Sequence, residues 1–368
     1  MRLILFIHSL SSGGAERAST NLANYWADKG WHITLVTMTG CEQDFYQLHP
    51  DIQRIALCLD AESSGLLTAI QSNVQRTKAL RNVLKQQQPD VALAIMTTAN
   101  ILLALAARGL NITVIGSERI HPPMLPLGRA WEWLRKRSYR HLDAVTALTE
   151  ETALWLKAET FAQYVPIIPN AVTYPIAIHS PRVSPNIAKG ENFKLIAVGR
   201  LSPQKGFNRL LSAFAVLASR FPDWSLIILG EGSCRNSLEK QRAELMLEQR
   251  VLFPGAVGNL GEWYETADLY VMSSLFEGFP NTLVEAMAYG LPVVSVDCDT
   301  GPRDIIHDKV DGLLVPQNNH QALVEALAVL MSDKILRQQY AAQAIEIRDR
   351  LSMQKIAGMW EGLFFDVC

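Results

Sequence analysis

Cysteine is scarce in this sequence, and long apolar runs are missing. The five cysteines are scattered along 368 residues without a C-x-x-C pair, which argues against a disulfide framework or a zinc site and favours a reducing compartment. No run approaches the roughly 18 apolar residues of a membrane-spanning helix. The apolar start, Met1–Ile7, is short and lacks a cleavage pattern, so we interpret it as a buried strand. We expect a cytoplasmic protein, with at most peripheral association at the cytoplasmic face of the inner membrane.

A strong charge of either sign is also absent. The formal net charge is −2, which argues against a global preference for nucleic acid and leaves room for a local basic patch. No Gly-x-x-x-x-Gly-Lys-Ser/Thr pattern occurs, which argues against an ATPase. Hydrophobic residues make up 49% of the chain, which is enough apolar material for two cores at this length.

Short apolar segments alternate with helical patterns through most of the chain. This alternation predicts an α/β protein whose helices cover both faces of parallel sheets. The expected strands are Leu3–His8, His32–Thr37, Val91–Ile95, Thr113–Gly116, Ala144–Ala147, Lys194–Val198, Ser225–Leu229, Arg250–Phe253, Leu269–Met272, Pro292–Val296 and Gly312–Val315. The expected helices include Ala15–Lys29, Thr68–Gln87, Glu150–Glu159 and Met353–Phe365.

Prolines divide the pattern into two parts. Five of them gather between Pro166 and Pro185, a composition that indicates a linker. We therefore predict one domain over residues 1–170 and a second over residues 171–349. We expect the last helix, at about residues 350–368, to pack back on the first domain.

Glycines and cations follow the first expected strand of each domain. Gly13 and Gly14 permit close approach of the backbone to a ligand, and the next helix offers its N-terminus to an anion, although a plain tight turn fits equally. In the second domain, Arg200 offers forked donors and Lys205 a point charge. This pair suits a diphosphate, whose negative charge grows as an attached sugar leaves. The alternative is that both are solvated surface charges.

Two carboxylates frame the segment from Glu277 to Glu285. A helix is expected to begin near Thr282, capped by Asn281 or Thr282, with N–H groups that can hold phosphate. Glu277 lies in the loop before it, where it can accept hydrogen bonds from sugar hydroxyls. Glu285 lies one turn in, where it suits a ribose. Thr282 and Glu285 also fit a capping box that needs no ligand, and Glu277 fits an ordinary loop carboxylate.

These residues together carry a resemblance to a known family. Gly-Arg-Leu-x-x-x-Lys-Gly, Leu-Gly-Glu-Gly, Gly-x-Val, Glu-Gly-Phe-Pro-Asn-Thr-Leu-Val-Glu-Ala-Met-Ala, Gly-Leu-Pro-Val-Val and Asp-Gly-Leu-Leu-Val follow one another in the second domain. With Gly-Gly-Ala-Glu-Arg and Pro-Asn-Ala-Val in the first, the chain resembles the GT4 family of retaining glycosyltransferases over most of its length. The resemblance implies the GT-B fold, in which two Rossmann-like domains face each other across a deep cleft.

The resemblance also implies roles for residues. Arg200 and Lys205 would bind the diphosphate of a nucleotide-sugar donor, Glu277 would contact the transferred sugar, and Glu285 would contact the ribose. No metal or other cofactor would be required. The second domain would hold the donor and the first the acceptor. The positions expected to contact the donor are Gly13, Gly14, Gly199, Gly230, Val257, Gly278, Phe279, Asn281, Thr282, Leu283 and Glu285.

The first domain departs from the family at one loop. The segment after the strand Thr113–Gly116 reads Ser-Glu-Arg-Ile-His-Pro, whereas many relatives place a histidine or aspartate near this point. Glu118, Arg119 and His121 compete for the place that faces the reacting sugar. We favour Glu118 and Arg119 as catalytic residues because they are nearest the strand end, and we leave His121 as a loop histidine or an acceptor contact.

Two further patterns imitate other sites. Gly230-Glu-Gly232 follows a strand, but Arg235 replaces the third glycine of a dinucleotide fingerprint, so the pattern is weak support for NAD. Asp297-Cys-Asp299 imitates the metal-binding pair of other transferases, and we do not interpret it as a metal site.

A basic, aromatic stretch in the first domain is our candidate for the acceptor side. Basic residues beside aromatic ones suit an interface with anionic lipids or the diphosphate of a lipid carrier. The alternative is a solvated basic helix whose tryptophans point inward. The residues concerned are Arg129, Trp131, Trp133, Arg135, Lys136 and Arg137.

The sequence thus predicts a retaining, metal-independent transferase. It would move a hexose or N-acetylhexosamine from a nucleotide-sugar, with UDP favoured, to a lipid-linked or cell-surface glycan. Two rivals remain: a sugar-nucleotide epimerase of the same fold, and a nucleotide-sugar-binding module without catalysis. The complete set of Arg200, Lys205, Glu277 and Glu285 argues against the binding module.

Overall fold

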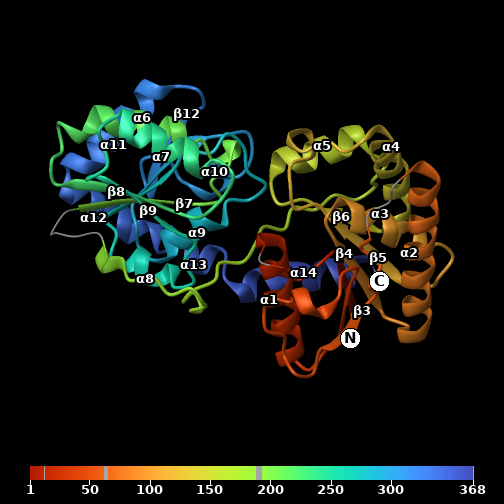
Figure 1. Ribbon diagram of the computed structural model, residues 1–368. Coiled ribbons are helices and arrows are strands. Elements are labelled where there is room, and N and C mark those ends of the chain that lie inside the picture. Colours follow the sequence, from red (N-terminus) through yellow and green to blue (C-terminus); the bar gives the residue numbers. More distant parts are fainter. Residues whose placement is uncertain (12, 62–64, 188–192, 368) are drawn as a thin grey trace. The chain divides into compact units, whose positions relative to one another are not determined.

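The computed structural model describes residues 1–11, 13–61, 65–187 and 193–367. Ser12 of the glycine-containing turn and Cys368 lie outside the described residues. The chain divides into two compact units (Figure 1). Unit 1 comprises Met1–Ala171 and Met353–Cys368, and unit 2 comprises Val172–Ser352.

Unit 1 is built on a parallel sheet of six strands in the order β3-β2-β1-β4-β5-β6. The strands are β1 (Arg2–Ile7), β2 (His32–Thr37), β3 (Gln53–Ala56), β4 (Val91–Ile95), β5 (Thr113–Ser117) and β6 (Ala144–Thr146). The α-helices are α1 (Gly14–Asp28), α2 (Leu66–Gln87), α3 (Thr97–Ala106), α4 (Arg129–Ser138), α5 (Glu150–Glu159) and α14 (Met353–Val367). Short 3-10 helices are η1 (Cys41–Gln43), η2 (Pro122–Met124) and η3 (Tyr139–His141).

Both faces of the unit 1 sheet are covered by helices. In β1, Ile4 and Phe6 belong to one core with residues of α2 and α3. Because side chains alternate along a strand, the buried Leu3 and Leu5 face the opposite side. The near-continuous apolar runs that predicted the strands reflect this burial on both faces.

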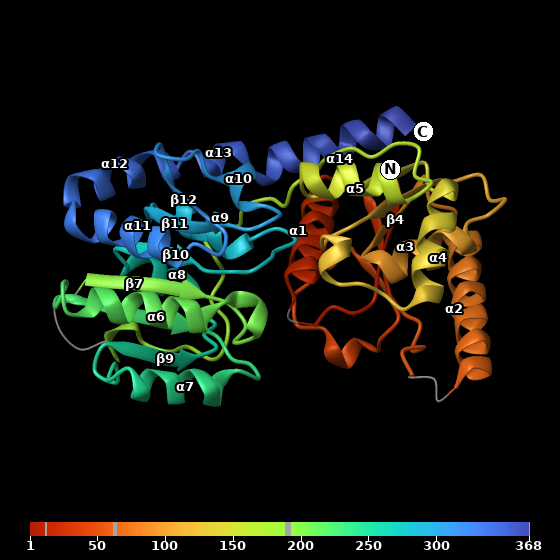
Figure 2. The same cartoon turned by 90° about the horizontal axis from the view of Figure 1, so that it is seen from above.

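Helix α14 returns from the end of the chain to pack on α1 (Figure 2). The ring of Trp26 lies 5.5 Å from that of Phe364, centroid to centroid. Lys29 Nζ lies 2.9 Å from Glu361 Oε1 on the surface beside them. The helix therefore belongs to unit 1, although it follows unit 2 in the sequence.

Unit 2 has a second parallel sheet of six strands, in the order β12-β11-β10-β7-β8-β9. The strands are β7 (Phe193–Val198), β8 (Trp224–Leu229), β9 (Val251–Gly255), β10 (Leu269–Met272), β11 (Val293–Asp297) and β12 (Gly312–Pro316). The helices are α6 (Phe207–Ala218), α7 (Arg235–Glu244), α8 (Leu260–Glu265), α9 (Asn281–Ala288), α10 (Pro302–Ile305), α11 (His320–Ser332), α12 (Lys334–Ala344) and α13 (Ile347–Arg350), with 3-10 helices η4 (Pro185–Ile187) and η5 (Pro203–Lys205).

The core of unit 2 lies mainly under α6 and α11. Phe207, Leu210 and Phe214 of α6 pack with Leu323 and Leu327 of α11 against the sheet. These positions are spaced at three or four residues, so each helix turns one apolar face to the strands. Two α/β units, each with a parallel sheet of six strands, confirm the predicted fold class.

The segment after Ala171 is fastened to unit 2. Val172 N donates to Leu351 O at 2.8 Å, and Ile176 N donates to Tyr289 Oη at 3.0 Å. The Arg348 guanidinium lies 3.6 Å from the centre of the Tyr174 ring. This part of the expected linker is therefore held by specific contacts.

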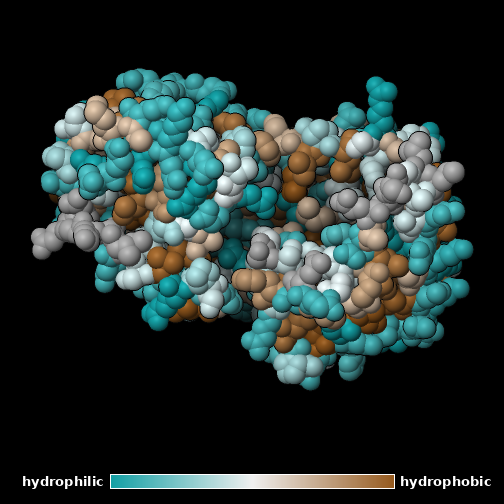
Figure 3. All heavy atoms as spheres, in the orientation of Figure 1, coloured by the Kyte–Doolittle hydropathy of each residue, from teal (hydrophilic) through white to brown (hydrophobic). Residues whose placement is uncertain are grey.

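Hydrophilic residues cover most of the face shown in Figure 3, with hydrophobic residues in smaller groups on both units. Large exposed apolar side chains of unit 1 include Leu125 and Trp133, which are 54% and 56% exposed. In the described part of the chain, no helix is both long and apolar enough to cross a membrane.

Candidate active site

The candidate site in unit 2 lies where the order of the strands reverses. The chain runs from β7 outward to β8 and β9, and then crosses back to β10 on the other side of β7. Neighbouring parallel strands end at the same edge, and ligands of open α/β sheets bind at such a switch point. Gly199 and Arg200 follow β7, and the loop leading to Glu277 follows β10.

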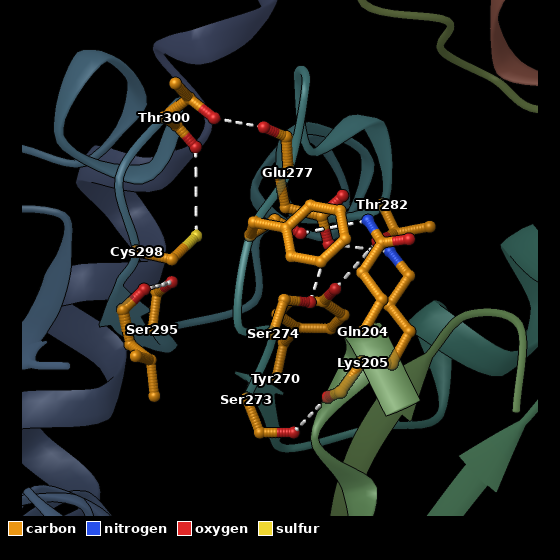
Figure 4. Close-up of polar contacts among 12 residues, drawn as sticks. Gln204, Lys205, Tyr270, Ser273, Ser274, Glu277, Thr282, Ser295, Cys298 and Thr300 are labelled. Carbon is orange, nitrogen blue, oxygen red and sulfur yellow. Dashed lines mark hydrogen bonds and ion pairs between the residues drawn. The ribbon is translucent and has the colours of Figure 1, made fainter. Parts of the chain in front are cut away.

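Lys205 and Glu277 form an ion pair at this edge (Figure 4). Lys205 Nζ lies 2.7 Å from Glu277 Oε1, and Ser274 Oγ donates to the same oxygen at 2.6 Å. Thr300 Oγ1 donates to the backbone oxygen of Glu277. Among the described residues, these donors engage only Oε1 of the carboxylate, so Oε2 keeps its capacity to accept a hydrogen bond.

The loop that carries Lys205 and the loop that carries Glu277 are also joined by hydrogen bonds to backbone oxygens (Figure 4). Gln204 Nε2 donates to Phe276 O at 2.9 Å, and Ser273 Oγ donates to Lys205 O at 2.9 Å. Leu275 N donates to Gln204 O at 2.7 Å. The positions of Lys205 and Glu277 are therefore fixed by their supporting loops and not only by their mutual attraction.

Glycines allow these loops to approach one another. Gly206 has φ +63°, and a Cβ there would lie 2.3 Å from Ser273 O. Gly230, in the loop after β8, has φ +138°, and a Cβ there would lie 2.0 Å from Gly199 O in the loop after β7. A side chain at either position would force the loops apart, because carbon and oxygen do not pack so closely.

Helix α9 begins without a side-chain cap. It starts at Asn281 after Pro280, so the prediction that Asn281 or Thr282 caps it is wrong. Thr282 lies inside the helix, and its Oγ1 pairs with Tyr270 Oη at 2.9 Å. Glu285 is buried in the first turns of the helix.

The other unit 2 residues predicted to contact the donor lie around this edge. Arg200 is exposed and, among the described residues, has no ion-pair partner. Phe279 and Leu283 are buried, whereas Val257 and Gly278 are half-buried. In unit 1, Gly13 and Gly14 stand at the start of α1, where Tyr46 Oη donates to Gly13 O at 3.1 Å.

Glu118 is part of a buried polar group at the end of β5. Its carboxylate accepts hydrogen bonds from Tyr139 Oη and from Thr97 Oγ1, the latter at 2.7 Å. Burial raises the pKa of Glu118 above its ordinary value, and the two hydroxyl donors oppose that rise. Burial and the neighbouring carboxylate raise the pKa of Tyr139 as well.

The other two residues of this loop are also buried. Arg119 is 5% exposed, and its Nη1 donates to Asn170 Oδ1 at 2.6 Å. His121 Nδ1 lies 3.1 Å from Thr152 Oγ1, a contact that suits a loop histidine. The catalytic roles predicted for Glu118 and Arg119 stay predictions.

The basic stretch is confined to α4, and the structure corrects the role of one of its residues. Arg135 is 2% exposed, pairs with Glu132, and lies with its guanidinium 4.6 Å from the centre of the Trp155 ring. A side chain so enclosed cannot contact a membrane surface. By contrast, Arg137 stacks on the exposed Trp133 at 4.9 Å, and both are available at the surface.

Several side chains that hold the sites together were not predicted from the sequence. In unit 2 these are Gln204, Tyr270, Ser274 and Thr300, and in unit 1 Thr97, Tyr139 and Asn170. Ser273-Ser274 directly after a buried strand was the available signal, since polar residues at a strand end point to the ligand edge. Asp297 pairs with Arg303 at 2.9 Å, and no metal-binding group of three His, Cys, Asp or Glu occurs in the described ranges.

Two family models match the chain. The model for glycosyl transferases group 1 matches residues 182–347, and the model for a glycosyl transferase 4-like domain matches residues 13–171. The matches therefore cover both units, and they do so without overlap.

Individual proteins are similar to this chain along all or nearly all of its length. An uncharacterized glycosyltransferase of Haemophilus influenzae is 29% identical, with 96% of each chain covered. GalNAc-α-(1→4)-GalNAc-α-(1→3)-diNAcBac-PP-undecaprenol α-1,4-N-acetyl-D-galactosaminyltransferase of Campylobacter jejuni is 27% identical, over 100% of this chain and 99% of that one. The solved structure of Anabaena HepE in complex with UDP has a TM-score of 0.80 at 19% identity, covering 100% of both chains. This chain belongs to the group 1 glycosyltransferases, the GT4 family, and has their GT-B fold.

Proposed function

We propose that this glycosyltransferase moves a hexose or N-acetylhexosamine from a UDP-sugar to a lipid-linked or cell-surface glycan, with retention of the anomeric configuration. The Lys205–Glu277 pair at the β7/β10 edge is the observation that carries the proposal. It places a cation and a carboxylate 2.7 Å apart, a spacing that suits a sugar diphosphate with its phosphate on one group and its sugar hydroxyls on the other.

The chemistry assigns each group a task. The bond from the sugar C1 to the β-phosphate oxygen breaks, a bond from C1 to the acceptor oxygen forms, and the acceptor proton passes to a phosphate oxygen. Arg200 and Lys205 stabilise the negative charge that develops on the diphosphate. Glu277 accepts a sugar hydroxyl through Oε2 and orients C1. No step in this scheme requires a metal ion.

The nature of the donor and acceptor is supported by similar proteins. HepE, a chain of the same fold, binds UDP in its solved structure. The name of the Campylobacter relative gives its acceptor as an undecaprenyl diphosphate-linked glycan and its cargo as N-acetylgalactosamine. We extend the UDP-sugar donor and the lipid-linked glycan acceptor to this chain, and we propose that its reaction takes place at the cytoplasmic face of the inner membrane.

Thermal-shift titration with UDP-, GDP- and ADP-sugars tests the donor. A ligand at 100 times its Kd stabilises a protein by about 2.7 kcal/mol, so the correct nucleotide raises the melting midpoint. Arg200→Ala is the matched variant, because its side chain is exposed and its loss leaves the fold intact. Equal shifts in wild type and variant, or a preference for GDP or ADP, contradict the assignment.

The transfer itself is tested with the donor that gives the largest shift. Incubation with a lipid diphosphate glycan gives a product whose anomeric configuration is measured by NMR, and activity persists in EDTA. Product inversion contradicts retention, and loss of activity in EDTA contradicts metal independence. Conversion of the donor to an isomeric sugar without acceptor indicates an epimerase instead.

Membrane association through α4 is tested by flotation with anionic liposomes. The variant carries Arg129→Gln, Lys136→Gln and Arg137→Gln, and it leaves the buried Arg135 unchanged. We expect the wild type to float with the liposomes and the variant to remain at the bottom, since each basic residue near an anionic surface contributes about 1 kcal/mol. Equal flotation of the two proteins contradicts this part of the proposal.

A further inference from the structure

Arg119 lies at the ligand edge of the unit 1 sheet. It follows β5 by two residues, and the backbone N–H of the preceding Glu118 bonds to Thr146 O of β6 at 2.9 Å. The order of the unit 1 sheet reverses at the neighbouring pair β1 and β4. Arg119 therefore stands at the carboxyl ends of parallel strands, where such sheets bind their ligands.

The guanidinium of Arg119 uses only part of its donor capacity. Nη1 donates to Asn170 Oδ1 at 2.6 Å. Nε and Nη2 are buried and have no hydrogen-bond partner in the described part of the chain. These two nitrogens form one edge of the guanidinium, and that edge matches two oxygens of a phosphate or carboxylate.

The charge of Arg119 is also uncompensated. Burial lowers the pKa of Arg119 to about 10, and no acidic group opposes that effect. The side chain thus stays charged at neutral pH, and a buried charge without a partner is strongly disfavoured. Such a group is expected to have an anionic partner when the protein works.

A second donor without a partner lies against it. The Arg119 Cζ atom is 5.8 Å from the centre of the Trp360 ring, which belongs to α14. Trp360 is fully buried, and its Nε1 has no hydrogen-bond partner within the described ranges. Buried indole N–H groups normally find an acceptor.

We propose that Arg119 binds a phosphate-type oxyanion through its Nε/Nη2 edge, in a site that Asn170 and Trp360 complete. Asn170 holds the guanidinium in place, and Trp360 supplies a flat wall and a further N–H group. The oxyanion is a free phosphate or diphosphate, or the phosphate group of an acceptor.

Pyrophosphate titration followed by thermal shift tests the site without any transfer reaction. The proteins are the wild type, Arg119→Met and Arg200→Met, so the unit 1 site is separated from the donor site in unit 2. We expect Arg119→Met to weaken the pyrophosphate response at least about tenfold, the loss expected when a charged hydrogen-bonding partner is removed. A response retained in Arg119→Met, or lost only in Arg200→Met, overturns the proposal.

Stability in anion-free buffer supplies the folding control. Arg119→Met removes an uncompensated charge, so this variant melts at or above the wild type. A much lower midpoint shows that the charge is already compensated within the protein and overturns the proposal. Trp360→Phe keeps an aromatic ring but removes the N–H group. We expect it to weaken pyrophosphate binding less than Arg119→Met does.

A kinetic arm identifies the source of the anion, and only this arm rests on the proposed function. The KM for a lipid diphosphate glycan is compared with that for the same glycan on an uncharged alcohol. If the acceptor supplies the phosphate, Arg119→Met raises only the first KM. If both KM values stay unchanged while pyrophosphate binding falls, the site takes a free anion. Absence of transfer in every protein rejects the transferase proposal and leaves the titration result standing.

Discussion

At the residue scale, the Lys205–Glu277 ion pair is expected to affect both the stability and the activity of the protein. Their side chains are 17% and 8% exposed, so Lys205→Met leaves a largely buried carboxylate, and among the described residues Ser274 is then its only side-chain donor. We expect a loss of about 2 kcal/mol in the free energy of unfolding, below the usual cost of breaking a fully buried pair. Turnover falls to background because the diphosphate loses one of its two cations.

Thermal unfolding of a double-mutant set checks this. Lys205→Met/Glu277→Gln recovers most of the loss of the single variant, because no unpaired carboxylate remains. Lys240→Met is the control, since Lys240 and Glu244 form an exposed pair at 3.8 Å that contributes little. Additive effects of the two site substitutions contradict the coupling.

A second residue-scale prediction concerns Glu118 and pH. Its pKa in the folded protein is raised above the ordinary 4.5, so the folded state favours the protonated carboxyl. The stability contributed by this group is therefore fully present below about pH 4.5 and is lost as the pH rises through the folded pKa. Glu118→Gln, which imitates the protonated form, gains stability over the wild type at neutral pH and loses that advantage in acid.

This difference is measured from the melting midpoints of both proteins between pH 4 and pH 8. A carboxyl group with a raised pKa titrates roughly in this window. Glu248→Gln replaces an exposed carboxyl and serves as the matched control. A difference between Glu118→Gln and wild type that is constant with pH contradicts the prediction.

The site residues show what a sequence can reveal at this scale. Arg200, Lys205 and Glu277 were found because polar residues directly after buried strands share one edge of a parallel sheet. Ser274 and Thr300 were missed because their contacts with Glu277 depend on how separate loops meet. Arg135 was assigned to the surface because its neighbours in sequence are basic, whereas Trp155 and Glu132 enclose it.

At the element scale, the loop ending at Gly206 is the sensitive part of the donor site. Gly206→Ala would place a Cβ 2.3 Å from Ser273 O, so the loop that carries Lys205 must move away from the loop that carries Glu277. We expect binding of UDP-sugar to weaken at least about tenfold, as small displacements in a site cost much activity. Isothermal titration measures this affinity.

Gly358→Ala is the matched substitution, because a Cβ at Gly358 meets nothing within 4 Å. It lies inside α14, where alanine favours the helix by about 1 kcal/mol, and donor affinity stays unchanged. Unchanged affinity in Gly206→Ala contradicts the account of the two loops.

Most strands were predictable from apolar runs, and β3 was the exception. Gln53–Ala56 lies at an edge of its sheet and has an exposed or half-buried pattern, so it lacks the continuous apolar signal of the inner strands. The cap of α9 was predicted wrongly for a different reason. Thr282 has the residue type of a cap, but it lies inside the helix, where Tyr270 engages its hydroxyl.

At the scale of the whole molecule, the candidate donor site belongs to a single unit. Lys205, Glu277, Ser274 and Thr300 all lie in unit 2, which is one continuous segment from Val172 to Ser352. We expect a fragment of residues 172–352 to fold and to bind UDP without transferring sugar. Circular dichroism and titration with UDP check this, and a folded fragment with no affinity for UDP contradicts the location of the site.

The return of α14 to unit 1 has a consequence for the order of events during synthesis. Unit 2 has all of its chain once Ser352 has left the ribosome, whereas Trp26 is covered only after Glu361 and Phe364 of α14 have emerged. Unit 1, whose first residues precede unit 2 in the chain, is therefore completed after unit 2. Apolar side chains of α1 stay uncovered while unit 2 folds. A nascent chain stalled before Met353 should recruit chaperones to its earliest residues.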